Sequence, residues 1–323
     1  MPNRKVSEIT YKRSILKRMS NRTNGTDAGI DASLVLLEGV TFVMSSNCIM
    51  KYFKGCEEFF VQKTINCLQE KNAVPKFLQL EMNIPYKFEE KILGRIIQEF
   101  NGAVAKRNMK ICQCRVYETN VNEPFIHVTV LGNATEAWES KIPKPGLDVV
   151  MAGSAGLGGT YVLSSLYLNQ LKERFSGSFA NECLIPKDLL SIEQSVKIAI
   201  SNDAVYMHNV SDGGAFGAIW ELASSTGLGI TVNTRQIPIW QQIVEVSEIF
   251  DINPYMLEGT GAILIVCSNG KQMEEALQNE GILAAHIGQL ESGNDRITID
   301  GEEKRYLEPP RGDELYKIIE KGD

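Results

Sequence analysis

The sequence predicts a two-domain α/β protein in which both halves mix strands and helices. Short β-rich runs alternate with amphipathic segments of helical period along the chain, a pattern typical of this fold class. The 323 residues are enough for two hydrophobic cores. A stiff, turn-rich segment, residues 142–146 (Ile-Pro-Lys-Pro-Gly), lies near the middle. We therefore expect one domain in residues 1–142 and another in residues 143–323.

Composition narrows the classes of partner. The net charge of -7 argues against nucleic acid, whose binding depends on Lys and Arg replacing counterions. No apolar run is long enough for a transmembrane helix, and residues 1–22 contain none that could serve as a signal sequence. The seven cysteines are odd in number, which disfavours a disulfide framework. We expect a cytoplasmic protein with small-molecule or protein partners and no contact with membrane or nucleic acid.

The first half begins with a short helix, residues 7–19, which either docks on the fold or forms an anion-binding arm. Two β-rich runs, 33–37 and 40–45, are joined at Glu38-Gly39 and predict a hairpin. Periodicity predicts helices over 57–71 and 88–109. Strands are expected over 77–82, where Asn83-Ile84-Pro85 ends the run, and over 110–118 and 125–131.

The second half repeats the alternation. Strands are expected over 149–152, 204–208, 229–233 and 262–267, and a final hairpin over 296–299 and 304–307 turns at Asp300-Gly301. Helices are expected over 161–175, 191–201, 215–225 and 240–250. Gly227 is a C-cap for the third of these helices.

Two glycine-rich turns are candidate anion sites. Gly213 and Gly214 precede a helix, whose N-terminal N–H groups suit an anion, or they only permit a tight turn, with Asp212 as a helix cap. Residues 153–159 (Gly-Ser-Ala-Gly-Leu-Gly-Gly) follow a strand and open a helix, so Gly153 and Gly156 belong to a phosphate cradle or to a packing contact. His208, at the end of a buried strand, is a catalytic candidate or a hydrogen-bonded core residue.

These residues resemble a known family. His208–Gly214 is similar to the His-Asp-x-Ser-Asp-Gly-Gly motif of the aminoimidazole ribonucleotide (AIR) synthetase-related superfamily, with Asn209 in place of the first Asp. Residues 227–238, 248–254 and 310–315 continue the resemblance, which is strongest toward the hydrogenase-maturation branch, and residues 66–75 extend it into the first half. The resemblance implies two α/β domains, with the N-terminal domains of a homodimer sharing a β-barrel. It also implies an ATP site with magnesium held by aspartates.

The chain departs from the family at those acidic positions. Asp31 keeps one carboxylate of a Gly-Asp-Asp-Ala segment, whereas Asn47 and Cys67 replace aspartates and Arg115 lies in the stretch that matches Gly-Gly-Asp-Thr. Arginine repels magnesium yet attracts an anion. The losses argue against ordinary Mg-ATP chemistry. The nucleotide or anion site implied by the resemblance consists of Asp31, Asn47, Asn66, Arg115, Gly153, Gly156, Gly213 and Gly214.

The resemblance also brings four cysteines toward the region of the lost aspartates: Cys48, Cys67, Cys112 and Cys114. Thiolates prefer zinc, copper(I) or iron–sulfur clusters to magnesium, so a metal site is one reading. The other reading is that these residues are buried apolar fillers, since cysteine is often buried and no neighbouring His is evident.

Two functional hypotheses follow. The first is an ATP-dependent enzyme that activates a small substrate through a phosphorylated intermediate, using Asp31, the glycine turn and His208 or Asp212. The second is a catalytically reduced homologue that keeps the dimer and binds a ligand, such as a phosphate-containing small molecule, or acts as a scaffold. The missing carboxylates favour the second. The hydrogenase-maturation factor carries its carbamoyl group on a terminal cysteine, whereas this sequence ends Ile-Glu-Lys-Gly-Asp, so we do not expect that carrier role.

Overall fold

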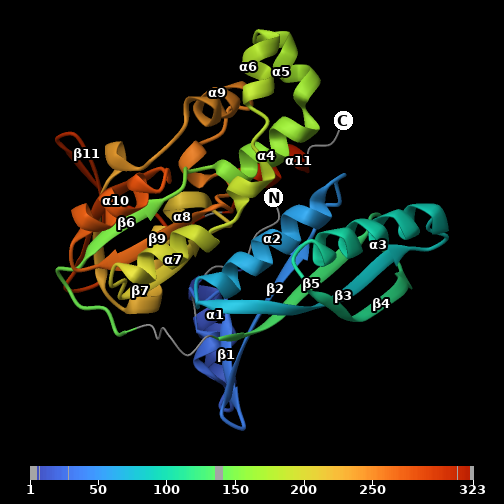
Figure 1. The fold of residues 1–323 in the computed structure, drawn as a ribbon, viewed down its shortest axis with the longest axis horizontal. Coiled ribbons are helices and arrows are strands. Elements are labelled where there is room, and N and C mark those ends of the chain that lie inside the picture. Colours follow the sequence, from blue (N-terminus) through green and yellow to red (C-terminus); the bar gives the residue numbers. More distant parts are fainter. Residues whose placement is uncertain (1–5, 7, 28, 135–140, 311, 321–323) are drawn as a thin grey trace. The chain divides into compact units, whose positions relative to one another are not determined.

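The computed structural model describes residues 6, 8–27, 29–134, 141–310 and 312–320. They form two compact units (Figure 1). The unit that we call the first domain comprises residues 23–25 and 31–137, and the second domain comprises residues 1–22, 26–30 and 138–323. The N-terminal segment therefore packs with the second domain, although it precedes the first in sequence. Hydrogen bonds between Glu8 and the side chains of Trp220 and Ser224 hold it there.

In the described part of the first domain, the strands form a five-stranded sheet in the order β1-β2-β5-β3-β4. The predicted hairpin is present, and its turn residues Glu38 and Gly39 have φ of 50° and 83°. Only the β3–β4 pair is parallel. The elements are β1 (Ser33–Leu37), β2 (Val40–Ile49), α2 (Cys56–Gln69), β3 (Ala73–Pro85), α3 (Glu90–Ala105), β4 (Lys110–Thr119) and β5 (Phe125–Ala134).

The two faces of this sheet differ in burial. Side chains that alternate along β2, β3 and β5 are buried on the face that α2 covers, including Val43, Leu80 and Val128. The other face, which we call the open face, exposes apolar side chains that lie beside one another in register. They are Val35, Val40, Phe42, Met44 and Phe77.

The second domain contains a seven-stranded sheet in its described residues, in the order β12-β11-β8-β10-β6-β9-β7. Its strands are β6 (Asp148–Ala152), β7 (Tyr206–Val210), β8 (Gly229–Asn233), β9 (Ala262–Cys267), β10 (Ala284–Glu291), β11 (Arg296–Asp300) and β12 (Glu303–Tyr306). Its helices are α1 (Glu8–Ser14), α4 (Leu157–Leu166), α5 (Leu168–Arg174), α6 (Gly177–Glu182), α7 (Glu193–Ser201), α8 (Gly214–Thr226), α9 (Gln241–Ile249), α10 (Gly270–Asn279) and α11 (Glu314–Ile319).

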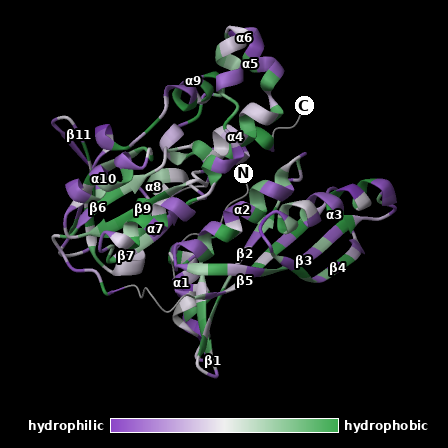
Figure 2. Ribbon diagram, in the orientation of Figure 1, coloured by the Kyte–Doolittle hydropathy of each residue, from purple (hydrophilic) through white to green (hydrophobic). Residues whose placement is uncertain are grey.

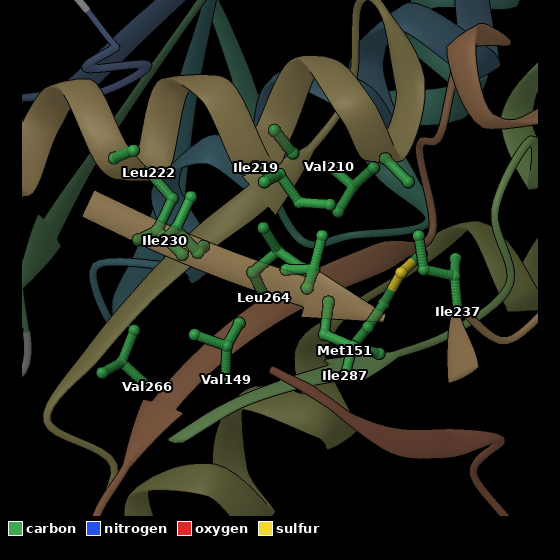
Figure 3. Packing of buried hydrophobic residues seen from close by; sticks show 14 of the residues in the cluster. Val149, Met151, Val210, Ile219, Leu222, Ile230, Ile237, Leu264, Val266 and Ile287 are labelled. Carbon is green, nitrogen blue, oxygen red and sulfur yellow. The ribbon is translucent and has the colours of Figure 1, made fainter. Parts of the chain in front are cut away.

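Helices cover both faces of this sheet. On one face α8 packs Ile219 and Leu222 against Leu264 and Ile230 of the strands (Figure 3). On the other face, residues of α7 and α10 share a second apolar cluster with β9. All residues of β9 are buried, which explains its continuous apolar sequence, seen as a green strand in Figure 2. No helix in the described ranges is both long and apolar enough to cross a bilayer.

The structure corrects several expectations about elements. The helix predicted over 161–175 is two helices, α4 and α5, which meet at Tyr167. Strand β3 continues through Asn83 to Pro85, because its last residues still pair with β4 and β5. Two elements differ from the sequence prediction because it contains no counterpart for them: α10, whose residues are mostly polar, and β10, which lies at the centre of the sheet.

Candidate functional site

Strand β7 leads into the turn that carries the motif. All of its residues are buried, and Ser211, Asp212 and Gly213 connect it to α8. Gly213 and Gly214 have φ of 79° and 63°, a backbone conformation that favours glycine. The two glycines therefore let the buried strand turn at once into the helix.

The carboxylate of Asp313 lies at the N-terminus of α8. Its Oδ2 accepts a hydrogen bond from the N–H of Gly213 at 2.6 Å. Its Oδ1 accepts from the N–H groups of Glu258 at 3.1 Å and Leu315 at 2.8 Å. Helix N-termini favour negative charge. The hydrogen-bond acceptor at this turn is therefore a carboxyl group of the same protein.

Asp212 and Glu258 bring two further carboxylates to Asp313. One oxygen of each lies within 4.8 Å of the other two. Burial raises the pKa of Asp313 well above its ordinary value, and the charges of Glu258 and Asp212 raise it further, against the N–H groups of Leu315 and Gly213, which lower it. Carboxylate oxygens are ligands for magnesium and calcium, so these three residues could hold a hard divalent cation.

Glu258 belongs to a buried segment, residues 257–262, that runs beside both glycine turns. A Cβ added to Gly214 would lie 2.5 Å from the carbonyl oxygen of Leu257, and one on Gly153 would lie 2.5 Å from that of Gly261. Such distances are closer than any side chain tolerates. Both glycines therefore allow the backbone of this segment to approach.

In the second glycine turn, residues 153–159, backbone N–H groups also donate to carbonyls of the same protein. The N–H of Ala155 donates to the carbonyl of Pro238 at 2.9 Å, and that of Gly159 donates to the carbonyl of Glu258 at 2.7 Å. Gly156 is the N-cap of α4 with φ of 69°, and its missing Cβ makes room for Ile243. Of the two sequence interpretations, this geometry favours packing over a phosphate cradle.

His208, the other catalytic candidate, is buried on β7. Its Nε2 lies 3.4 Å from Oε2 of Glu221 on α8. This contact fits the interpretation of a hydrogen-bonded core histidine. Asp212, in contrast, lies within the carboxylate group at the start of α8.

The nucleotide-site candidates of the first domain lie partly along α2. Asn47 on β2 donates from Nδ2 to the hydroxyl of Thr64 on α2 at 3.1 Å. Asn66 is buried on the same helix. The backbone carbonyl of Asp31 accepts a hydrogen bond from the hydroxyl of Ser45 at 2.7 Å. These contacts join the segment before β1 to β2, and β2 to α2.

Arg115 lies on the opposite side of the sheet. It is in register with Glu81, whereas the neighbouring Leu80 and Met82 of β3 are buried on the face that α2 covers. Because successive side chains of a strand point to opposite faces, Arg115 points to the open face. The structure therefore does not bring Arg115 together with Asn47.

The four cysteines do not form a common site. Cys48 on β2 and the pair Cys112 and Cys114 on β4 are separated by β5 and β3, about 14 Å at ordinary strand spacing. Cys67 is buried in α2, where its thiol donates to the carbonyl of Lys63 at 3.4 Å. The interpretation as a buried filler fits Cys67 and is wrong for Cys112 and Cys114, which are exposed. Among the described residues, no metal-ligand group includes any of the four.

Sequence reasoning did not select Glu258 or Asp313 as site residues. Glu258 is the one charged residue within the run 255–267, and an isolated carboxylate in such a run is a signal for a buried polar contact. Asp313 precedes Glu-Leu at the start of a helix, a typical N-cap position. The local pattern contains no sign that the two carboxylates meet.

Comparison with known proteins finds a family match for the second domain. Residues 144–300 match the family model described as AIR synthase related protein, C-terminal domain. The carbamoyl dehydratase HypE of Cupriavidus necator is 22% identical over 267 residues, which cover 80% of this chain and 72% of that protein.

Solved structures share the fold over nearly the whole chain. HypE in a HypE–HypF complex has a TM-score of 0.72 at 18% identity, covering 93% of this chain and 99% of the other. The hydrogenase maturation protein HypE in complex with ATP has a TM-score of 0.68 at 18% identity, covering 95% and 96%. Residues 144–300 therefore match the AIR synthase-related family, and the two domains have a fold similar to that of the HypE structures.

Proposed function

We propose that this protein is a catalytically reduced, HypE-like member of the superfamily that binds a ligand or acts as a scaffold instead of performing ordinary Mg-ATP chemistry. The observation that carries the proposal is the loss of carboxylates at positions where the resemblance implies magnesium ligands, now Asn47 and Cys67. In the second domain, the carboxyl group of Asp313 accepts the N–H of Gly213 at the N-terminus of α8, a donor that a phosphate would otherwise use. A phosphate at this turn has to displace a buried side chain held by three backbone donors.

The sequence of the first domain supports the same proposal. Two of the positions at which the family has aspartates carry Asn47 and Cys67, and a third acidic stretch carries Arg115. Magnesium prefers oxygen ligands with negative charge. Of the aspartates that the resemblance implies, Asp31 remains, and the buried carboxylate of Glu70 lies within 4.8 Å of it. Two carboxylates are fewer than the set that the family provides for a metal beside ATP phosphates.

The proposal includes a cytoplasmic homodimer. The open face of the first-domain sheet exposes Val35, Val40, Phe42, Met44 and Phe77. Exposed apolar patches of this kind mark interaction surfaces. A second copy of the same sheet would cover the patch and pair the two first domains.

A thermal melt with Mg-ATP tests the proposal. A ligand at 100 times its Kd stabilises a fold by about 2.7 kcal/mol, which raises Tm by roughly 5–10 °C for domains of this size. We expect millimolar Mg-ATP to shift Tm by less than about 1 °C relative to magnesium alone. A rise of several degrees that Asp31→Ala abolishes would refute the reduced function and support an ATP-dependent enzyme.

A further inference from the structure

Positive charge is concentrated at the N-terminal end of this acidic chain. Residues 1–22 contain seven of the 33 Lys and Arg residues and one of the 40 acidic residues, Glu8. This segment therefore carries a net charge of +6, against -13 for the rest of the chain. Charge asymmetry of this size is typical of an interaction segment.

Glu8 attaches this N-terminal segment to α8. Its Oε2 accepts hydrogen bonds from Nε1 of Trp220 at 2.7 Å and from the hydroxyl of Ser224 at 3.0 Å. The guanidinium of Arg296 stacks on the Trp220 ring at 3.9 Å and donates to the Ser224 hydroxyl at 2.8 Å. Burial raises the pKa of Glu8, but hydrogen bonds from Lys12, Trp220 and Ser224 outweigh it and lower the pKa overall. The only acid of the segment is thus engaged on its inner side.

The basic side chains remain on the outer side. Arg13, Lys17 and Arg18 are exposed, and Arg18 donates to the backbone carbonyls of Arg13 and Ser14 in α1. Within the described part of the chain, no acidic side chain pairs with Arg13 or Lys17. Lys12 pairs with Glu8 and Arg22 with Asp27. Anchoring therefore presents uncompensated cations at a fixed place on the second domain.

Exposed apolar side chains accompany these cations: Val6, Ile9 and Met19. Phosphate backbones are bound mainly through cations and polar groups, so apolar neighbours favour a protein partner over nucleic acid. A membrane-surface helix needs a continuous outward apolar stripe, whereas Tyr11 and Leu16 are partly buried and the exposed apolar residues are scattered.

We propose that residues 6 and 8–22 form a docking site for an acidic surface of a partner protein, with Arg13 and Lys17 as its principal charge contacts. Complementary charge speeds encounter and selects partners. Val6, Ile9 and Met19 provide the apolar contact that an acidic protein surface can bury. This site is separate from the glycine turns, and it does not depend on whether the protein binds ATP.

Peptide selection tests the proposal without knowledge of the partner. The full-length protein is used to select from a random peptide library displayed on phage, and enriched peptides are measured by fluorescence anisotropy at ~150 mM salt, where surface charges are well screened beyond about 8 Å. We expect enriched peptides to combine Asp or Glu with apolar residues. The double variant Arg13→Glu/Lys17→Glu should weaken their binding by about tenfold or more.

A matched control separates this site from general electrostatics. Lys271→Glu/Lys304→Glu changes the net charge equally at two exposed positions elsewhere on the second domain, and it should change affinity by less than about twofold. Equal losses in both variants, enrichment of non-acidic peptides or no enrichment would overturn the proposal. Tighter binding to phosphatidylserine-containing vesicles or to duplex DNA than to the peptides would overturn it in favour of a membrane or nucleic-acid site.

Discussion

At the scale of single residues, Asp313 has the contacts with the largest expected effect on the stability of the second domain. It caps α11 through the N–H of Leu315, and it also accepts N–H groups from the start of α8 and from Glu258. One side chain thereby ties three separate segments of the second domain together.

Replacement of Asp313 by alanine should therefore destabilise the second domain by about 2–4 kcal/mol, because three buried N–H groups lose their acceptor. Asp313→Asn retains one carbonyl oxygen and should cost less. Urea denaturation followed by circular dichroism measures both. A loss below about 0.5 kcal/mol for the alanine variant would mean that water satisfies the donors.

The raised pKa of Asp313 also predicts a pH dependence. As the pH rises above about 4, the unfolded chain loses this proton while the folded chain keeps it. The free energy of unfolding should therefore fall with rising pH until the folded pKa is reached. Asp313→Asn has no such proton, so its stability relative to the wild type should improve over the same window. If the stability of Asp313→Asn relative to the wild type instead decreases over this window, the N–H donors of Gly213, Glu258 and Leu315 hold the carboxylate ionised.

At the scale of elements, the start of α8 shows how a glycine motif can serve packing. Gly214 combines a positive φ with close approach of the Leu257 and Tyr255 carbonyls. Gly213 has a positive φ, but a Cβ there would meet nothing closer than 3.5 Å. The two neighbouring glycines are therefore required for different reasons. Gly213 is required by its backbone conformation alone, whereas Gly214 is required by its conformation and by the lack of space for a side chain.

We expect Gly214→Ala to destabilise the protein by roughly 2–4 kcal/mol through steric conflict and backbone strain. Gly102→Ala is the matched control, since that glycine lies inside α3 with open space around its Cβ position. The control should stabilise the protein by about 0.5–1 kcal/mol through helix propensity. Thermal or urea unfolding measures the stability of both variants. Equal changes in stability would contradict a packing role for Gly214.

At the scale of the whole molecule, the two domains bury their sheets differently. Helices cover both faces of the second-domain sheet, whereas the first-domain sheet keeps an apolar open face. That difference is the basis of the proposed homodimer, since an exposed apolar sheet face is costly for an isolated protein.

Light scattering at micromolar concentration should give about twice 35.9 kDa. Phe42→Glu, which places a charge in the open face, should shift the protein toward monomer, because burial of an unpaired carboxylate is unfavourable. Tyr86→Glu makes the same type of change at a more exposed position of the first domain and should leave the mass unchanged. A monomeric wild type at this concentration would contradict the dimer.

Local sequence determined most of the regular elements. The predicted bounds 229–233 and 262–267 are those of β8 and β9, and the Glu38-Gly39 turn joins the strands expected on either side. The final hairpin is also present, but its turn is Gly301-Glu302, because Asp300 still pairs with Glu303. Alternation, helical period and turn residues act over a few neighbouring residues, so they can be recognised in the sequence alone. The second glycine motif likewise lies at a strand-to-helix turn, as expected.

Tertiary structure alone decided what those turns do. Asp313 reaches Gly213 across 100 positions of the chain, and the carbonyls near Leu257 determine that Gly214 must lack a side chain. The sheet likewise separates Cys48 from Cys112 and Cys114, which a family resemblance had brought together. The sequence by itself therefore specified the fold class, most strands and helices, and the glycine turns, because these depend on local conformation. The occupant of the α8 N-terminus depends on contacts between distant segments, which local patterns do not encode.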